Sequence, residues 1–275
     1  MLGKVIKQLL SRHQPARPLL SFIICSVDDA RFAGVQASIE QHLAGASHEL
    51  IRINDARSLA EGYNRGMQCS RGELLIFCHD DIEFLQPDFA ARIVEHLKRF
   101  DLVGVAGTTR LVDGYWGTVG QPEIFGQVVQ PDRDGEGITL YVFDNDRVPA
   151  ANIQALDGLF LAVRRPVAEA LRFDDVNFTG FHLYDTDFCY RVHLAGYRVG
   201  VCRDLLIFHN SHGDKSEDWQ RYMEVFAHKY RDRLSGGSPV GRQMMLTVKL
   251  PNKESAVPAF DNLRRNPPRM SEPQA

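Results

Sequence analysis

Short apolar runs alternate with amphipathic segments from Leu19 onwards, and this alternation limits the fold more than any other feature of the sequence. The runs LLSFIIC, ELIRIND and ELLIF, at residues 19–25, 49–55 and 73–77, have the length of strands. The segments between them carry apolar residues three or four positions apart, which indicates helices. Strands and helices that alternate in this way form right-handed crossovers, so the sequence predicts an α/β fold with a mostly parallel central sheet and helices on both faces.

The segment from Thr108 to Ala155 has a different character, because it is rich in Gly, Asp and Pro and carries isolated aromatic residues. We expect irregular hairpins and loops there, over one end of the sheet. Regular patterning returns with the strand-like run LFLAVRR at residues 159–165. A helical pattern follows at residues 185–195 and ends at Gly196, a residue that commonly ends helices.

These patterns divide the chain into an N-terminal segment, one domain with two halves, and a C-terminal extension. The parts are residues 1–17, residues 18–235 with halves at 18–107 and 108–235, and residues 236–275. The first segment has apolar residues at helical spacing with basic residues between them, which fits either a helix packed on its own domain or a peripheral contact with a membrane surface. The extension is polar and rich in proline, and we expect it to be largely disordered after about residue 250.

Composition excludes several classes of protein. The formal net charge is -3, which gives no global electrostatic reason to expect a nucleic-acid partner. No apolar run approaches the ~20 residues that span a bilayer, and the N-terminus has no secretory signal. The five cysteines are scattered without a CxxC pair, so we expect free thiols in a reducing compartment. The predicted location is therefore the cytoplasm, with membrane association on its cytoplasmic face as an option for residues 1–17.

Polar side chains follow three of the predicted strands, at the point where each strand ends. They are Ser26, Asp28 and Asp29 after the first, Asn54 and Asp55 after the second, and His79, Asp80 and Asp81 after the third. In an open parallel sheet these ends lie along one edge, where ligands bind. Clustered carboxylates repel one another unless a cation is present, and Mg²⁺ or Mn²⁺ would resolve the repulsion. The alternative is that these residues serve turns and helix caps, although a cap needs one such residue and the third cluster has three.

Other devices for binding phosphate are absent from the sequence. There is no GxxxxGK[ST] loop, and no GxGxxG follows the first predicted strand. A nucleotide bound at this edge would therefore be held by its base, its ribose and a metal ion on its diphosphate.

Four stretches, in this order, resemble motifs of the GT-A fold glycosyltransferases, in particular the large inverting family two. SLAEGYNRGMQCSRGELLIFCHDDIEF at residues 58–84 is similar to the Asn-x-Gly helix and the strand that ends in an Asp-x-Asp motif. LDGLFLAVRR at residues 156–165 resembles the acceptor-side strand, and LYDTDFCYRVHLAGYRVGV at residues 183–201 resembles the Glu-Asp-x-Asp helix. FHNSHG at residues 208–213 is similar to a late His-containing segment of the metal site. The resemblance extends over roughly Leu19 to Gly213, with its motifs in the order that the family shows.

The resemblance implies a role for each matching residue. Asp185 would be the general base, and Asp81 and His209 would bind the divalent metal, with His212 as the alternative to His209. The residues assigned to the nucleotide sugar are Ser26, Asp55 at the base, Asn64, His79 at the ribose or diphosphate, and Asp80. The residues assigned to the acceptor are Asp157, Trp116, His182 and Asp187. From the residues alone, Trp116 could equally cover the core, His182 could cap a helix and Asp187 could stabilise one.

The sequence departs from the family pattern at two positions. His79 stands where the family usually has the first Asp of its motif, which puts the ribose contact and the choice of metal in question. Tyr184 stands where many members have Glu, so the assignment of the base depends on Asp185 alone.

The expected function is that of a metal-dependent, inverting glycosyltransferase. It would move a sugar from a nucleotide-diphosphate donor to a saccharide or lipid-linked acceptor, in surface polysaccharide synthesis, with Mn²⁺ or Mg²⁺ as cofactor. Two alternatives use the same residues: a metal-dependent hydrolase of phosphate or sugar esters, and a non-catalytic module that binds nucleotide or carbohydrate. The hydrolase would need no acceptor, and the module would tolerate loss of Asp185.

Overall fold

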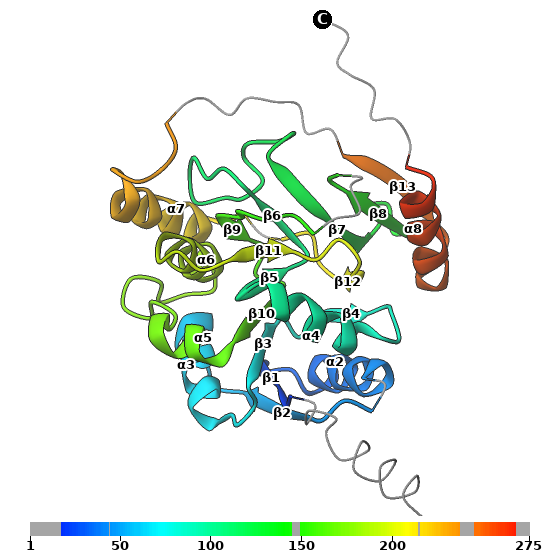
Figure 1. Ribbon diagram of the computed structural model, residues 1–275, viewed down its shortest axis with the longest axis horizontal. Coiled ribbons are helices and arrows are strands. Elements are labelled where there is room, and N and C mark those ends of the chain that lie inside the picture. Colours follow the sequence, from blue (N-terminus) through cyan, green and yellow to red (C-terminus); the bar gives the residue numbers. More distant parts are fainter. Residues whose placement is uncertain (1–17, 44, 145–148, 214, 237–244, 268–275) are drawn as a thin grey trace, which may run out of the picture.

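The computed structural model describes residues 18–43, 45–144, 149–213, 215–236 and 245–267, and it confirms the predicted α/β class (Figure 1). Six strands form the central sheet, in the order β11-β5-β10-β3-β1-β2. Their bounds are Val199–Val201 (β11), Leu102–Gly104 (β5), Phe160–Arg164 (β10), Leu74–Cys78 (β3), Leu20–Cys25 (β1) and His48–Ile53 (β2). Strand β10 is antiparallel to both neighbours and the other adjacent pairs are parallel, so the sheet is mostly parallel as predicted.

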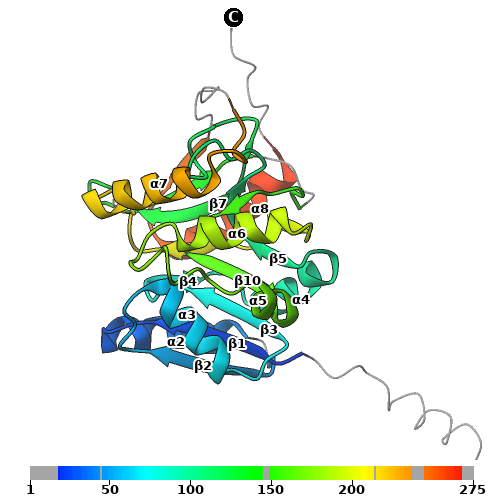
Figure 2. The same cartoon turned by 90° about the vertical axis from the view of Figure 1, so that its left-hand side faces the viewer.

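Helices cover both faces of this sheet, because the side chains of its strands alternate between two hydrophobic clusters. Phe22 and Ile24 of β1 pack in one cluster with helices α2 (Asp29–His42) and α4 (Phe89–Arg99). Ile23 faces the other cluster, on the side of the sheet whose helices lie towards the viewer in Figure 2. Its helices are α3 (Leu59–Cys69), α5 (Arg165–Leu171), α6 (Tyr184–Leu194) and α7 (Glu217–Tyr230). Each fully buried Phe or Ile contributes about 1.5–3 kcal/mol to folding, so this alternation favours the two-sided arrangement strongly.

A second sheet lies beside the first, and the sequence did not predict it. Its main path is β13-β8-β7-β12-β4, and β6 joins β7 to β9. The bounds are Leu246–Leu250 (β13), Ile138–Val142 (β8), Ile124–Pro131 (β7), Ile207–His209 (β12), Ile82–Phe84 (β4), Ala106–Thr108 (β6) and Ala155–Leu156 (β9). The predicted hairpins between residues 108 and 155 are present as β7 and β8, which pair antiparallel.

The run LVGVAG at residues 102–107 is divided between the two sheets as β5 and β6. Glycine permits this crossing, since a Cβ at Gly107 would lie 2.4 Å from the carbonyl oxygen of Ala155 in β9. Each sheet contains strands from before and after residue 107. The predicted boundary between the two halves therefore does not divide one sheet from the other.

The expectation of disorder after about residue 250 is wrong for residues 251–267. The 3-10 helix η1 (Lys253–Ser255) leads into α8 (Ala256–Arg265), and Ala256 and Phe260 pack against Val129 and Leu140 of the second sheet. The many polar residues of this segment lie on the exposed side of the helix, and composition alone does not reveal its narrow apolar face. Residues 1–17 and 268–275 lie outside the described residues, and so does the predicted membrane contact.

All five cysteines are free thiols, and three of them, Cys78, Cys189 and Cys202, are buried. Within the described ranges, no helix has both the length and the apolar character needed to cross a bilayer.

Candidate functional site

The ends of several strands open onto one cavity of about 790 Å³. His79, Asp80 and Asp81 follow β3, His209 ends β12, and Asp185 stands in the first turn of α6. Ten of the residues predicted from the sequence line this cavity. They are Ser26, His79, Asp80, Asp81, Trp116, Asp157, His182, Asp185, His209 and His212. The polar side chains that follow β1 and β3 thus lie at one cavity, as expected for one edge of the sheet, whereas Asp55 after β2 does not line it.

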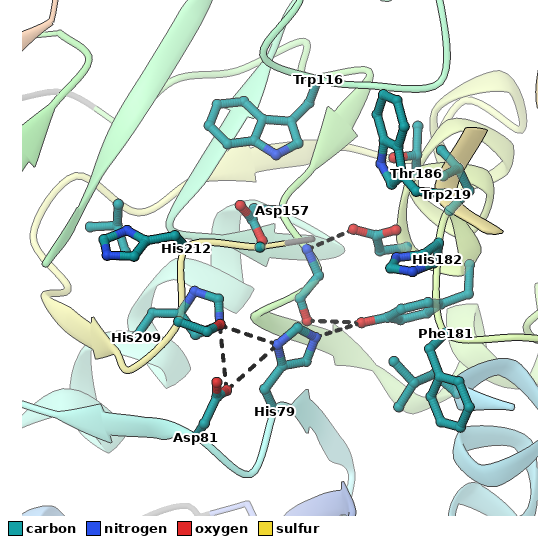
Figure 3. A pocket seen from close by; sticks show the side chains of 18 of the residues that line it. His79, Asp81, Trp116, Asp157, Phe181, His182, Thr186, His209, His212 and Trp219 are labelled. Carbon is teal, nitrogen blue, oxygen red and sulfur yellow. Dashed lines mark hydrogen bonds and ion pairs between the residues drawn. The ribbon is translucent and has the colours of Figure 1, made fainter. Parts of the chain in front are cut away.

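Three of these side chains converge on one point (Figure 3). His79, Asp81 and His209 each offer a ligand atom, and these atoms lie within 4.8 Å of one another. His209 Nε2 is 3.4 Å from Asp81 Oδ1 and 3.5 Å from His79 Nδ1, and His79 Nδ1 is 3.9 Å from Asp81 Oδ1. His212 lines the same cavity but does not belong to this cluster. The geometry thus favours His209 over His212 as the metal ligand from the segment at residues 208–213.

The charges of the cluster depend on one another. Burial favours the neutral form of Asp81, but the contact with His209 and the charge of both imidazoles outweigh it and lower the pKa of this carboxyl to about 2. Burial opposes charge on His209 too, and its contact with Asp81 nevertheless raises the pKa of this imidazole above the usual value. Burial and the neighbouring charge of His209 lower the pKa of His79. Asp81 is therefore ionised near pH 7, which is the form that binds metal ions, whereas a cation at this site would have to displace the proton that Asp81 favours on His209.

Two imidazole nitrogens and one carboxylate oxygen are donors that divalent transition ions accept. The three side chains are half-buried or buried, and they leave one side open to the cavity. The residues present therefore fit a divalent cation such as the predicted Mn²⁺.

The backbone of Gly158 joins this cluster to Asp185. The N–H of Gly158 donates to Asp185 Oδ2 at 2.8 Å, and its carbonyl oxygen accepts from the hydroxyl of Tyr184 at 3.3 Å. The Tyr184 oxygen is in turn 3.0 Å from His79 Nε2. Figure 3 shows this chain of contacts running from the carboxylate to the imidazole.

Asp185 reaches the cavity through an unusual turn. Leu183, directly before α6, has φ +61°, a left-handed conformation that costs a non-glycine residue about 1–3 kcal/mol. Burial and the negative charge of Asp157 together raise the pKa of Asp185 to about 7. A carboxylate with this pKa accepts protons near neutral pH, so the site contains a candidate general base.

Aromatic side chains line the wall above the cluster. Trp116 is 8% exposed and packs at 5.4 Å from the Phe143 ring, so it covers the core and faces the cavity at once. Trp219 of α7 lies 6.1 Å from the Tyr115 ring, and Lys215 Nζ lies 4.6 Å from that same ring. Aromatic rings that border a cavity in this way offer apolar contact area to a ligand.

Three predicted site residues do not line the cavity. Asp55 is exposed at the end of β2, and its carboxylate pairs with Arg65 at 2.6 and 3.2 Å. The buried amide of Asn64 exchanges hydrogen bonds with the backbone of Phe173 at 2.9 Å. Asp187 is fully buried, and its carboxylate forms ion pairs with Arg191 and Lys229 and does not face the cavity. Successive side chains of an α-helix are turned by about 100°, so Asp187, two residues after Asp185, points to another side of α6, and its acceptor role stays a prediction.

Sequence reasoning missed the part played by Gly158, Trp219 and Lys215. A single sequence gives no sign that Trp219 belongs to the site, because its neighbours in the cavity come from distant parts of the chain. The tight fit of Gly158 between Tyr184 and Asp185 has no signal in a single sequence beyond the presence of a glycine in the motif.

Comparisons with known proteins support the family resemblance. The sequence model of a family described as "Glycosyltransferase like family" matches residues 21–230, which is more than half of the chain. No curated protein matches the chain.

Two solved structures share its fold. The crystal structure of GalNAc-T7 with UDP, GalNAc and Mn²⁺ aligns with a TM-score of 0.52 at 13% identity, covering 78% of this chain and 49% of that one. The mannosyltransferase PcManGT from Pyrobaculum calidifontis, in complex with GDP-Man and Mn²⁺, aligns with a TM-score of 0.50 at 11% identity, covering 97% of this chain and 77% of that one. The chain thus spans about half the length of the GalNAc-T7 structure. The likeness confirms the predicted GT-A fold.

Proposed function

Because this chain belongs to the glycosyltransferase-like family, we propose that it transfers a sugar from a nucleoside-diphosphate donor to a hydroxyl group of a saccharide or lipid-linked acceptor. The observation that carries the proposal is the presence of Asp185 in the same cavity as the cluster of His79, Asp81 and His209. Transfer of this kind uses a base that takes the proton of the acceptor hydroxyl and a cation that stabilises the leaving diphosphate, on opposite sides of the anomeric carbon. This cavity has candidates for both.

Asp185 is the proposed general base. The acceptor hydroxyl gives its proton to the Asp185 carboxylate while its oxygen forms a bond to the anomeric carbon. The bond from that carbon to the phosphate oxygen breaks, and the nucleoside diphosphate leaves with the electron pair. Attack from the face opposite the leaving group inverts the configuration. The raised pKa of about 7 makes Asp185 a stronger base than an ordinary carboxylate while much of it stays ionised at neutral pH.

Asp81 and His209 are the proposed ligands of the divalent cation. When bound, such a cation would neutralise the negative charge that develops on the leaving diphosphate. The pairing of Asp81 with His209 holds this carboxylate ionised and turned towards the cavity. The structures of GalNAc-T7 and PcManGT contain Mn²⁺, which supports Mn²⁺ for this chain as well.

The donor and the acceptor are assigned to different walls of the cavity. Ser26 and Asp80 stand at the ends of β1 and β3, where the proposed donor would lie, and Arg31 comes within 3.8 Å of Asp80. Trp116, Asp157 and His182 line the same cavity as Asp185 and are proposed to face the acceptor; the three are labelled in Figure 3. Contacts of Asp55 with the base, and a place in surface polysaccharide synthesis, stay predictions.

The proposal is tested by a thermal-shift screen of nucleoside diphosphates and nucleotide sugars, each with and without Mn²⁺ or Mg²⁺. We expect at least one nucleotide to raise the melting temperature only when the metal is present. If no nucleotide stabilises the protein with either metal, the proposal is contradicted. The donor found in this way is then incubated with and without candidate acceptors. Release of free sugar at equal rates in both cases would identify a hydrolase instead.

A further inference from the structure

We infer that His79 is a third ligand of the cation, fixed in its metal-binding tautomer by Tyr184, and that the centre therefore prefers Mn²⁺ and later transition ions to Mg²⁺. The inference rests on the proposed function and specifies the cation of the same site. It departs from the resemblance, which places His79 at the ribose or diphosphate and implies an Asp at this position.

The direction of the His79 ring is the first argument. Its Nδ1 faces the other two members of the cluster, at 3.5 Å from His209 Nε2 and 3.9 Å from Asp81 Oδ1. Its Nε2 points the opposite way, towards Tyr184. One ring nitrogen is thus directed at the space where a cation would lie, and the other is engaged by the protein (Figure 3).

The hydrogen bonds of Tyr184 decide which nitrogen carries the proton. A phenol has one proton, and Tyr184 donates it to the Gly158 carbonyl, which can only accept. In the arrangement that satisfies both contacts, the Tyr184 oxygen accepts at 3.0 Å and His79 Nε2 carries the imidazole proton. Nδ1 is left with a free electron pair that faces Asp81 and His209. A partner that fixes the tautomer in this way is the usual companion of a metal-bound histidine.

Packing holds Tyr184 in this position. Its side chain is 2% exposed, with the rings of Tyr63 and Phe173 at 5.6 and 6.1 Å. On the other side, a Cβ added to Gly158 would lie 2.5 Å from the hydroxyl oxygen. The buried Tyr184 ring is therefore held against Gly158, which has no side chain to displace the hydroxyl, and the ring orientation is set before any cation binds.

The donor set determines the class of cation. Mg²⁺ prefers oxygen donors, whereas imidazole suits the transition ions, whose affinity rises along the series from Mn²⁺ to Cu²⁺. A site with one imidazole and several oxygens accepts either class. Replacement of one oxygen donor by the nitrogen of His79 makes imidazole the majority among the three protein ligands, which disfavours Mg²⁺.

Pulsed electron paramagnetic resonance of the protein loaded with Mn²⁺ tests the inference without any assay of activity. Imidazole ligands produce ¹⁴N couplings, and we expect two ligand nitrogens in the wild type and one in His79→Asn, which offers an amide oxygen in place of Nδ1. His212→Asn is the matched control and should keep both. A wild type with one ligand nitrogen, or loss of a nitrogen in His212→Asn instead, would overturn the inference while leaving the proposed function standing. Failure of Mn²⁺ to bind the wild type at all would contradict the metal-dependent function itself.

Competition between the two metals gives the second readout. Titration of Mg²⁺ into the Mn²⁺-loaded protein should show that His79→Asn lowers the preference for Mn²⁺ by about 10-fold. An unchanged preference would contradict the third ligand. Tyr184→Phe should weaken Mn²⁺ binding by about 10-fold while both ligand nitrogens remain. Tyr190→Phe, on the same helix, loses a hydroxyl that donates only to the Arg233 carbonyl, and it should leave Mn²⁺ binding unchanged. Equal affinities in the two tyrosine variants would remove the positioning role from Tyr184.

Discussion

His79 Nε2 and the hydroxyl oxygen of Tyr184 lie 3.0 Å apart. These are the two positions at which the sequence departs from the pattern of the family it resembles, and they turn out to contact each other across 105 positions of sequence. Two carboxylates at this separation would repel unless one held a proton. A histidine and a tyrosine share a hydrogen bond instead, so the two departures form one local arrangement beside Asp185.

The fit of Gly158 in this arrangement leads to a prediction about Gly158→Ala. The added Cβ would lie 2.5 Å from the Tyr184 hydroxyl oxygen and 2.7 Å from Asp185 Oδ2, so both side chains must move. We expect transfer to fall by about 100-fold, the loss typical of a misplaced catalytic group, with secondary structure retained by circular dichroism. Gly34→Ala in α2, where nothing lies within 4 Å of the new Cβ, serves as control and should keep full activity. Full activity in Gly158→Ala would show that the contacts around it are not needed.

The buried ion pairs of Asp187 lead to a prediction about the stability of the fold. Asp187 is fully buried and accepts from Arg191 Nε at 2.8 Å and from Lys229 Nζ at 2.5 Å. Asp187→Asn removes the negative charge from this network, and we expect the free energy of unfolding to fall by about 3 kcal/mol in urea denaturation. Asp218→Asn breaks an exposed pair on α7 and should change it by less than about 0.5 kcal/mol. Similar values for the two variants would mean that the Asp187 network does not stabilise the fold.

The acidity of Asp185 predicts a pH dependence. Its pKa is raised to about 7 by burial and by Asp157, and only the ionised carboxylate can accept a proton. The value of kcat/KM should therefore fall about tenfold per pH unit below this pKa and level off above it. Asp157→Asn removes a neighbouring negative charge, which lowers the pKa of Asp185 and moves the inflection to lower pH. An inflection that stays in place would exclude Asp157 as its cause.

Because α8 packs on the second sheet, we expect it to contribute to the free energy of unfolding. Phe260 is 2% exposed between α8 and the second sheet, so Phe260→Ala should lower the free energy of unfolding by about 3 kcal/mol. Asn262→Ala, at an exposed position of the same helix, should change the free energy of unfolding by less than about 0.5 kcal/mol. Equal stability of the two variants would indicate that α8 does not pack on the domain.

The parts of the fold that follow from local patterns could be predicted from the sequence. Strand β1 and the end of α6 near Gly196 are examples, because a short apolar run and a glycine that ends a helix can both be recognised within a few residues. The second sheet could not be predicted, since four of its seven strands have three residues or fewer and the strands are spread from Ile82 to Leu250. Helix α8 was missed for another reason: its apolar face becomes recognisable only against the surface formed by Val129 and Leu140.

The candidate site divides in the same way. Asp81, Asp185 and His209 were predicted from motifs, and the cavity brings them together. Asn64 and Asp187 also stand in motifs, but their side chains serve packing and ion pairs, and a motif does not record which way a helix faces. The grouping of His79 with the metal cluster, and its contact with Tyr184, depend on the approach of β3 and α6 in space.

The central claim is that Asp185 acts in transfer and Asp81 in metal-dependent binding of the donor. The most direct test measures both properties in both variants, with donor binding by calorimetry in Mn²⁺ and transfer by product formation. Asp185→Asn should lower kcat by about 100-fold or more while the dissociation constant of the donor stays nearly unchanged. Asp81→Ala should weaken donor binding in Mn²⁺ by at least about 10-fold, and the metal should then add little to the affinity. Equal loss of donor binding in the two variants, or undiminished transfer by Asp185→Asn, would contradict the account.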